Sequence, residues 1–177
     1  HMFGSFFEAL HQSAFQVSSV MTTTGYATTD FDKWPVFSRT VMLIVMCVGA
    51  CAGSTGGGFK VSRIVILAKS AKRELKRLAH PRSVSVITMD GKRISDEVVT
   101  GTNVFFFIYV VIFIVSLLIV STDGKDMVTN ISGVIATLNN IGPGLGEVGP
   151  TGNFSDFSWY SKVVFILDML LGRLEIF

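Results

Sequence analysis

The longest uncharged run in this sequence has a centre that reads Val104-Phe105-Phe106-Phe107-Ile108-Tyr109-Val110-Val111-Ile112-Phe113-Ile114-Val115. The run extends from Val98 to Thr122, and the nearest charged residues are Glu97 and Asp123. About 20 apolar residues are enough for an α-helix to cross a bilayer. The core helix of a soluble protein is seldom this long and apolar on every side. The run therefore predicts a transmembrane helix.

The composition of the whole chain also fits a membrane protein. Of its 177 residues, 49% are hydrophobic and 16% are charged, and the mean hydropathy is +0.55. Soluble domains carry about 25% charged residues, and disordered chains combine low hydrophobicity with high net charge. Two cysteines cannot staple a chain of this length, and the formal net charge of +2 gives no sign of nucleic-acid binding.

A second apolar run, from Val36 to Ala52, meets the glycine-rich tract Gly53-Ser54-Thr55-Gly56-Gly57-Gly58, beyond which helical character resumes to Ala79. A single helix over residues 35–79 would be roughly 65 Å long at about 1.5 Å per residue, whereas the hydrocarbon core is about 30 Å thick. Glycine is a poor helix former, so the tract predicts a break in this helix. A third apolar run, Tyr160 to Phe177, carries four charged residues.

The basic residues predict the orientation of the chain in the membrane. Ten of the fifteen Lys and Arg residues lie between Lys60 and Arg93, whereas the other connections are mainly acidic. Cytoplasmic loops carry an excess of Lys and Arg, so we expect the loop 69–95 to be cytoplasmic. A solvated basic helix or a nucleic-acid patch is the alternative. Within the loop, Asp90-Gly91 between two short alternating runs predicts a β-hairpin, which is either a docking point for a soluble partner or merely a compact loop.

Two segments of the chain follow the same plan. Residues 6–21 form a moderately apolar helical segment that ends in Thr22-Thr23-Thr24-Gly25-Tyr26, and residues 127–138 form another that ends in Asn139-Asn140-Ile141-Gly142-Pro143-Gly144. Gly25 and Gly142 are 117 residues apart. Each helical segment is too short to span a bilayer, and each tract is followed by an acidic connection and an apolar run. The sequence therefore predicts an internal repeat.

A half-helix that ends in irregular backbone has a specific meaning at membrane depth. Such backbone is tolerated there only when it is buried in protein or lines a watery cavity. The negative end of the helix dipole would point at that cavity, and exposed carbonyl groups could replace the water shell of a cation. The alternative interpretation is a pair of Thr-, Asn- and Gly-rich loops outside the membrane.

Four motifs together resemble one family of transporters: Met21–Tyr26, Gly53–Lys60, Asn139–Gly144 and Gly172-Arg173-Leu174-Glu175. They resemble the TrkH-type potassium uptake proteins of the Trk/Ktr/HKT superfamily, over residues 6–177. The Asn-Asn-Ile-Gly-Pro-Gly tract and the hairpin favour the TrkH branch over the KtrB branch. Members of the family contain four repeats of an outer helix, a pore helix with a filter, and an inner helix.

The resemblance implies an all-α membrane protein that is built like the pore of a potassium channel, with a Gly-rich break in one inner helix. Residues 1–79 would be the third-repeat pore helix, filter and broken inner helix, and 80–95 a cytoplasmic loop with a β-hairpin. Residues 96–177 would be the fourth repeat. Within it we expect an outer helix at 97–122, a pore helix at 126–138, a filter at 139–144 and a truncated inner helix at 158–177. The first and second repeats would be missing partners from the same protein.

The resemblance also assigns roles to individual residues. Backbone carbonyls of the filter bind dehydrated K⁺ in the family, and the matching positions are Thr23, Thr24, Gly25, Asn140, Ile141 and Gly142. Thr22, Tyr26 and Asn139 would support the filter rather than line it. The gate would be an intramembrane loop together with an arginine on the last inner helix, at Gly53, Ser54, Thr55, Gly56, Gly57, Gly58 and Arg173. A simple helix kink is the alternative for the loop, and we expect Asp168 to pair with a nearby basic side chain.

The function implied is translocation of K⁺ through a gated four-repeat filter in the bacterial inner membrane. The resemblance also implies a homodimer and a cytosolic nucleotide-binding regulatory subunit of the TrkA type, with no cofactor on this chain and no metal site beyond the K⁺ filter. Two alternatives remain at this stage. One is a Na⁺-permeable or Na⁺-coupled member of the superfamily, and the other is a non-conducting membrane receptor or assembly subunit. Channel conduction and symport with H⁺ or Na⁺ also both remain open.

An enzyme is not expected. No Ser/His/Asp or paired-carboxylate arrangement is evident in the sequence, and His1, His11 and His80 form no ligand set. Gly144–Gly149 has the spacing G-x-G-x-x-G, but Pro150 and Gly152 follow where a dinucleotide-binding motif requires the start of a helix.

Overall fold

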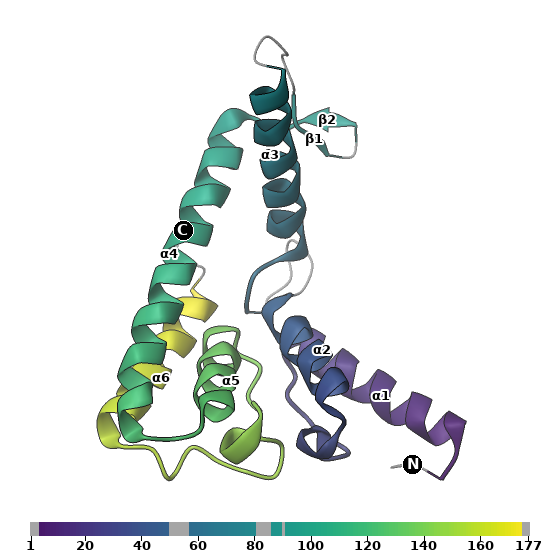
Figure 1. Ribbon diagram of the computed structural model, residues 1–177, viewed down its shortest axis with the longest axis vertical. Coiled ribbons are helices and arrows are strands. Elements are labelled where there is room, and N and C mark those ends of the chain that lie inside the picture. The colour runs from purple at the N-terminus through teal and green to yellow at the C-terminus, as the bar shows by residue number, and fades with distance from the viewer. Residues whose placement is uncertain (1–3, 50–56, 81–85, 90, 175–177) are drawn as a thin grey trace.

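The structure is a computed structural model, and it describes residues 4–49, 57–80, 86–89 and 91–174. Apart from one two-stranded hairpin and short 3₁₀ turns, the regular structure in these residues is α-helical (Figure 1). The helices are α1 (Phe6–Met21), α2 (Val36–Cys47), α3 (Val61–Ala79), α4 (Asp96–Val120), α5 (Met127–Leu138) and α6 (Trp159–Arg173). The prediction of an all-α fold is thus confirmed.

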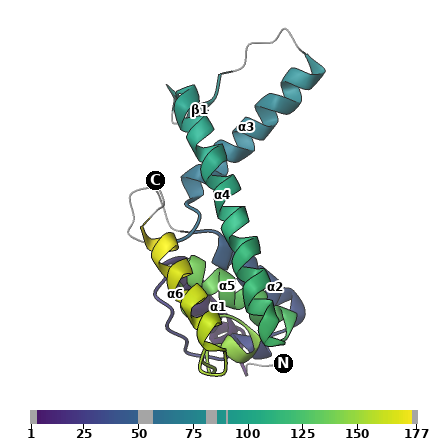
Figure 2. The same ribbon diagram turned by 90° about the vertical axis from the view of Figure 1, so that its left-hand side faces the viewer.

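Helix α4 is the longest element; it runs along one side of the molecule in Figure 1, and that side faces the viewer in Figure 2. Within the described residues, Asp96–Asp123 is the one helical segment that is long and apolar enough to cross a membrane. Helices α2 and α5 are apolar but have 12 residues each, which gives about 18 Å of length. Neither can span a bilayer alone.

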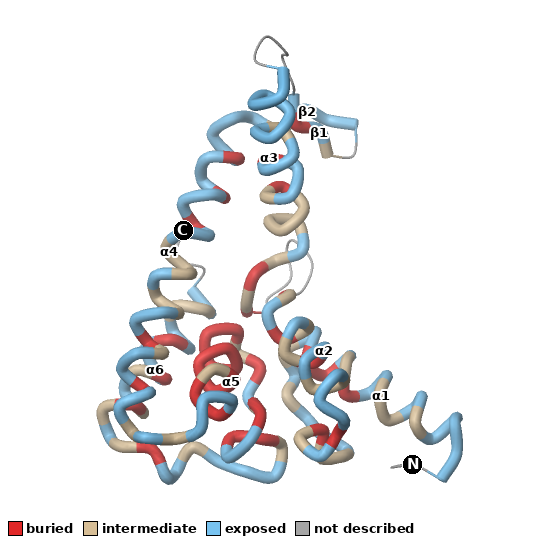
Figure 3. The backbone as a smooth tube through the Cα atoms, viewed as in Figure 1, coloured by how far each residue is buried: buried red, intermediate tan, exposed pale blue. Residues whose placement is uncertain are grey.

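Helices α5 and α6 pack against the half of α4 that leads to its C-terminus (Figure 1). The residues of α5 are mostly buried between its neighbours, as Figure 3 shows. The apolar side chains that hold this unit together come from all three helices and from the connection between α5 and α6. They are Val120, Val134, Val148, Phe157 and Phe165.

The N-terminus of α6 is held by the 3₁₀ turn that follows α4, Ser121–Asp123. Asp123 accepts a hydrogen bond from the backbone N–H of Ser158 at 3.0 Å and another from the hydroxyl of Tyr160 at 2.7 Å. A carboxylate at a helix N-terminus is favourable because the helix dipole is positive there. Helix α6 begins at Trp159 and ends at Arg173, whereas the sequence predicts an inner helix over 158–177. Residues 175–177 lie outside the described part of the chain.

Helices α1 and α2 form a second unit that meets the first through a shared core. This core joins side chains from α1 and α2, and from the turn between them, to Ile135 of α5 and to the chain that follows α5. Its members are Val20, Phe31, Trp34, Met42, Met46, Ile135, Ile141 and Leu145. The amide of Gln16 donates to the carbonyl oxygen of Thr29 at 3.1 Å. This bond fixes the chain that follows residues 22–26 against α1.

The apolar run that begins at Val36 is helical for a shorter distance than its length to Ala52 suggests. Helix α2 ends at Cys47, and Val48 pairs with Phe59 in an isolated parallel bridge. The backbone N–H of Gly49 donates to the carbonyl of Phe59 at 2.9 Å, so this stretch hydrogen-bonds across the chain instead of continuing the helix. Residues 50–56 lie outside the described ranges, and the Gly-rich break stays a prediction.

The hairpin consists of β1 (Thr88–Met89) and β2 (Lys92–Arg93), which pair antiparallel with Thr88 opposite Arg93. Gly91 has a φ of 75°, which suits the two-residue turn that the Asp-Gly sequence predicts. The chain before the hairpin packs between α3 and the start of α4 through Ile66, Ile87 and Val99.

Candidate ion filter

Helices α1 and α5 end in the same backbone conformation, residue for residue. They lead into the two tracts of the repeat, which we call the first tract (residues 22–26) and the second tract (residues 139–144). After α1, the N–H of Thr23 donates to the carbonyl of Val20 and that of Thr24 to the carbonyl of Ser19, at 3.1 and 2.9 Å. The equivalent bonds after α5 join Asn140 to Thr137 and Ile141 to Ala136, at 3.0 and 2.9 Å. These paired bonds define the Schellman ending of a helix. The same bonds recur 117 residues apart, at the offset that the sequence repeat predicts.

The φ angles of the two tracts change sign in the same order. Thr23 and Asn140 are the non-glycine residues with positive φ in the described part of the chain, at 54° and 56°. Gly25 and Gly142 follow two residues later, at 77° and 106°. The left-handed region is costly for residues that carry a Cβ, and glycine occupies it freely. Each tract therefore leaves its helix in an irregular conformation, in which one residue with a Cβ and then one glycine have positive φ.

The two tracts lie against each other although they are far apart in sequence. A Cβ added to Gly25 would overlap the carbonyl oxygen of Ile141 and come within 3.3 Å of the Pro143 ring. A Cβ added to Gly142 would meet no atom within 4 Å. The absence of a side chain at Gly25 is therefore what allows the first tract to approach the backbone of the second.

Side chains and backbone from α4 and α6 hold the second tract. The hydroxyl of Tyr109, in the middle of α4, donates to Oδ1 of Asn139 at 2.9 Å. The amide of Asn140 donates to the backbone carbonyl of Met169 in α6 at 3.0 Å. Gly172 of α6 packs directly on the end of α5, because a Cβ there would overlap the carbonyl oxygen of Leu138.

Hydroxyl groups hold the first tract. Thr22 donates to the carbonyl of Ser18 at 2.7 Å, and its Oγ1 lies 2.8 Å from that of Thr24. Ser19 donates to the backbone carbonyl of Tyr26 at 2.6 Å. Tyr26 itself contributes this carbonyl while its ring is exposed.

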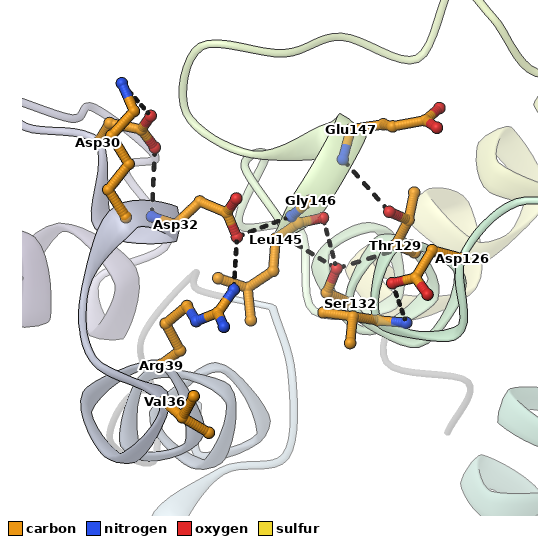
Figure 4. Close-up of polar contacts among 12 residues, drawn as sticks. Asp30, Asp32, Val36, Arg39, Asp126, Thr129, Ser132, Leu145, Gly146 and Glu147 are labelled. Atoms are coloured by element: carbon orange, nitrogen blue, oxygen red, sulfur yellow. Dashed lines mark hydrogen bonds and ion pairs between the residues drawn. The ribbon is translucent and has the colours of Figure 1, made fainter.

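Beyond the second tract, polar contacts connect the two halves of the chain, as Figure 4 shows. Ser132 of α5 accepts a hydrogen bond from the backbone N–H of Leu145 at 2.8 Å and donates to its carbonyl at 3.1 Å. The next residue, Gly146, donates its backbone N–H to Oδ1 of Asp32 at 2.9 Å. Arg39 lies 3.5 Å from the same oxygen. Asp32 therefore joins the segment after the first tract to the segment after the second.

An ion pair lies at the edge of this polar region. Lys125 Nζ is 2.6 Å from Oε2 of Glu147, and the hydrogen bond to this carboxylate raises the pKa of Lys125. The backbone N–H of Glu147 also donates to Oγ1 of Thr129 at 3.2 Å. Within the described residues, no three His, Cys, Asp or Glu side chains gather as metal ligands. The oxygen atoms that the two tracts present are backbone and side-chain carbonyls and hydroxyls.

The predicted gate residues fall partly outside the structure's described ranges, since Gly53, Ser54, Thr55 and Gly56 are not among them. Gly57 and Gly58 are described and lie against the second tract. A Cβ on Gly57 would be 2.6 Å from the carbonyl oxygen of Asn139, and one on Gly58 would be 2.8 Å from its Oδ1. Arg173 is the last residue of α6 and directly follows Gly172.

The residue after these glycines is anchored in an aromatic cluster. Phe59 is buried, and its ring centroid lies 5.6–5.9 Å from those of Phe105, Phe106 and Tyr109 on α4. Tyr109 therefore touches both Phe59 and Asn139. The end of the glycine-rich tract, α4 and the second tract form one continuous set of contacts.

Asp168 differs from the expectation of a basic partner. Its carboxylate is buried and accepts a hydrogen bond from Ser116 of α4 at 2.7 Å, and its second oxygen has no partner among the described residues. Arg173, five residues further on, is offset by about 140° around a helix of 3.6 residues per turn. The two side chains therefore do not share a helix face. Among the described residues, Asp168 forms a hydrogen bond with Ser116 and no ion pair.

Sequence reasoning missed three contributors to this region: Tyr109, Asp32 and Ser19. One signal was present for Tyr109, because it is the single residue with a hydrogen-bonding side chain between Val104 and Val115. A lone hydroxyl in an apolar helix usually has a partner. Nothing in the local sequence marks the bond of Asp32 to the backbone of Gly146 or that of Ser19 to the backbone of Tyr26, because backbone groups carry no sequence signal.

Comparison with known proteins supplies the family. The model of a family described as "TrkH: Cation transport protein" matches residues 5–177. This chain is a member of the TrkH family of cation transport proteins. It is 45% identical to the Trk system potassium uptake protein TrkH of Vibrio parahaemolyticus over its whole length, which covers 36% of that protein. It is 41% identical to the TrkH protein of Escherichia coli, again over all 177 residues and 36% of the relative.

A TrkH crystal structure extends the comparison to three dimensions. The potassium transporter TrkH from Vibrio parahaemolyticus matches with a TM-score of 0.87 and 45% identity, over 100% of this chain and 37% of that one. The Trk system potassium uptake protein TrkG of Escherichia coli is 35% identical over 93% of this chain and 34% of the relative. The family resemblance and the all-α membrane-transporter fold expected from the sequence are thus confirmed, and the chain spans about a third of the length of the TrkH proteins it matches.

Proposed function

We propose that this chain supplies two of the four tracts of a potassium-selective filter. The observation that carries the proposal is the repeat itself: two short helices end in the same hydrogen bonds, with left-handed residues at Thr23 and Asn140 and at Gly25 and Gly142. A left-handed residue is a common helix ending, but the second residue of positive φ, two positions later in both tracts, is not part of that ending. The names of the relatives, which are potassium uptake proteins, support K⁺ as the ion.

The filter would act by replacing water around the ion. A cation loses its hydration shell only when carbonyl oxygens converge on it at similar distances. The C-terminal end of a helix adds a partial negative charge, and both tracts begin at such an end. The Schellman bonds and the contacts from Tyr109 and Met169 would keep the carbonyls in position when no ion is bound.

Two tracts cannot enclose an ion, so the remaining two would come from the rest of the transporter. The share of the TrkH proteins that this chain covers supports that arrangement. Within the complete protein, this chain would be the third repeat and the fourth, with the loop 80–95 on the cytoplasmic side. The approach of Gly25 to Ile141 would be the contact between neighbouring tracts.

The intramembrane gate would be the glycine-rich tract Gly53–Gly58. Its described end, Gly57 and Gly58, lies against Asn139 at the base of the filter, which supports a position in the ion path. Glycines can rearrange at low cost, and small residues allow a pore to narrow. A fixed positive charge at Arg173 would oppose the passage of K⁺ until the tract moves.

The assembly implied by the family follows from the same proposal. The basic segment between Lys69 and Arg93 would face the cytoplasm of a bacterium, where a nucleotide-binding regulatory subunit would dock. The complete transporter would be a homodimer in the inner membrane. Nucleotide would bind the regulatory subunit rather than this chain.

Uptake of Rb⁺ by the complete transporter in proteoliposomes tests the function. With regulatory subunits supplied, we expect Rb⁺ uptake that excess K⁺ suppresses and excess Na⁺ does not. Equal suppression by Na⁺ would indicate a Na⁺-permeable or Na⁺-coupled member of the superfamily. Absence of uptake, in protein that binds its regulatory subunit, would favour a non-conducting receptor or assembly subunit.

A further inference from the structure

A small basic cleft lies between α3 and the chain that leads into β1. It has a volume of about 200 Å³ and is lined by four cationic side chains and by three residues of the approaching chain. These residues are Lys69, Lys72, Arg73, Lys76, Val86, Ile87 and Thr88. The cleft is separate from both filter tracts. It lies within the basic segment that we propose docks a regulatory subunit, and such docking does not by itself require a concave site.

The four cations share one face of α3 because their spacing follows the helical repeat of three and four residues. Lys69 donates to the backbone carbonyl of Thr88 at 2.6 Å, which closes the cleft at one end. Arg73 is 3.0 Å from Asp96 and 3.3 Å from Glu74. Neither Lys72 nor Lys76 has a carboxylate partner among the described residues. The cleft therefore holds more positive charge than its own carboxylates neutralise.

The contact between Arg73 and Asp96 fixes the level of the cleft relative to the membrane. Asp96 is the first residue of α4, the helix that is long and apolar enough to span a bilayer. The apolar cluster of Ile66, Ile87 and Val99 lies next to it, one helical turn from Lys69. The cleft thus begins where the apolar part of the molecule ends, at the depth of lipid headgroups.

We propose that this cleft binds the phosphate of an anionic phospholipid in the cytoplasmic leaflet, an inference that rests on the membrane topology in the proposed function. Ammonium and guanidinium groups form short, charge-assisted hydrogen bonds with phosphate oxygens. Basic pockets beside transmembrane helices on the cytoplasmic side suit lipid headgroups. The position of the cleft at the level of the lipid headgroups favours a lipid over a soluble anion. Its small volume favours a headgroup over the surface of an acidic protein.

Binding of short-chain phosphatidylglycerol to the detergent-solubilised complete transporter tests the inference, with phosphatidylcholine and inorganic phosphate as comparison ligands. Replacing both unpaired lysines, Lys72→Gln with Lys76→Gln, should weaken phosphatidylglycerol binding by about tenfold or more. The matched control removes two cations from the hairpin, Lys92→Gln with Arg93→Gln, and should change binding by less than about twofold.

Any of four results would overturn the inference. Equal weakening by the two pairs of substitutions would mean that diffuse charge attracts the lipid. Full competition by inorganic phosphate would mean a free-anion site. Loss of regulatory-subunit binding in the Lys72 and Lys76 variant, with lipid binding unchanged, would mean a protein-docking surface. The lipid measurement does not depend on ion uptake, so a transporter that takes up Rb⁺ without preferring phosphatidylglycerol would refute this inference alone.

Discussion

Thr23 and Asn140 occupy a backbone conformation that glycine normally supplies at the end of a helix. Each carries a cost of about 1–2 kcal/mol relative to the right-handed region, and the fold retains both. The Schellman bonds account for the positions of these residues, and Asn140 gains a further hydrogen bond to Met169. Strain of this kind is often concentrated at functional sites, which agrees with a role for these tracts in binding an ion.

Tyr109 provides a test of how the second tract is supported. We predict that Tyr109→Phe lowers the free energy of unfolding by about 1 kcal/mol, the usual net value of one hydrogen bond, and reduces the preference for Rb⁺ over Na⁺ because Asn139 loses its partner. Tyr160→Phe is the control, since it removes a hydrogen bond to Asp123 far from either tract. Uptake assays should separate the two variants. Equal selectivity in both would contradict the supporting role of Tyr109.

Asp168 and Ser116 form a buried pair whose energetic coupling can be measured. We predict that Ser116→Ala costs about 1–3 kcal/mol, as expected when a buried hydrogen-bonding group loses its partner, and that the cost is smaller when Asp168→Asn is also present. Thermal unfolding of the four members of this double-mutant cycle measures the coupling. Ser121→Ala removes a hydroxyl from the turn after α4 that bonds only its own helix, and its cost should not depend on residue 168. Strictly additive effects at positions 116 and 168 would show that the pair is not coupled.

At the scale of elements, α5 and α6 approach closely because Gly172 faces the end of α5. We predict that Gly172→Ala destabilises the transporter by about 1–3 kcal/mol or prevents folding, since the added Cβ would overlap the carbonyl of Leu138. Gly101→Ala is the matched control on α4, where a Cβ meets nothing within 4 Å, and it should stabilise the helix by about 0.5–1 kcal/mol. Thermal unfolding checks both. Equal effects would mean that the close approach of α6 to α5 is unimportant.

Helix positions could be predicted from the sequence because each depends on local signals. Residues 127–138 are mainly apolar. They lie between Asp126, which caps the helix, and the glycine-containing tract that follows it. The end of α2 could not be predicted, since the apolar run continues while Val48 pairs instead with Phe59. The two tracts after α1 and α5 could be located from the sequence repeat, but their surroundings could not, because contacts such as that of Asp32 with Gly146 depend on how the two halves pack.

For the molecule as a whole, burial is uneven between the repeated helices. Most of α5 is buried, whereas α1 buries Gln16, Ser19 and Val20 and leaves Phe6 and Phe7 more than three-quarters exposed. The chain spans about a third of the length of the TrkH proteins that it matches. The exposed apolar face of α1 is therefore where we expect the remaining repeats of the transporter to pack.

The contact between Asp32 and Gly146 gives a prediction at this scale, because it joins the two halves. Asp32→Ala leaves the N–H of Gly146 without its acceptor and should cost about 1–2 kcal/mol of stability, with slower Rb⁺ uptake because the two tracts lose their fixed spacing. Asp156→Ala, in the exposed connection before α6, is the control and should change neither quantity. Normal uptake and stability in the Asp32 variant would show that other contacts set the arrangement of the halves.

Rb⁺ uptake under Na⁺ competition, compared between Gly142→Ser and Gly124→Ser in the complete transporter, tests the assignment of the filter most directly. Both glycines have positive φ, 106° at Gly142 and 70° at Gly124, and neither would bring a new Cβ within 4 Å of another atom. Both substitutions therefore place a side chain on a backbone of positive φ without a direct clash. Only Gly142 belongs to a tract. We predict that Gly142→Ser abolishes uptake or lets Na⁺ compete, while Gly124→Ser retains selective uptake. Selective uptake by the Gly142→Ser variant would contradict the account.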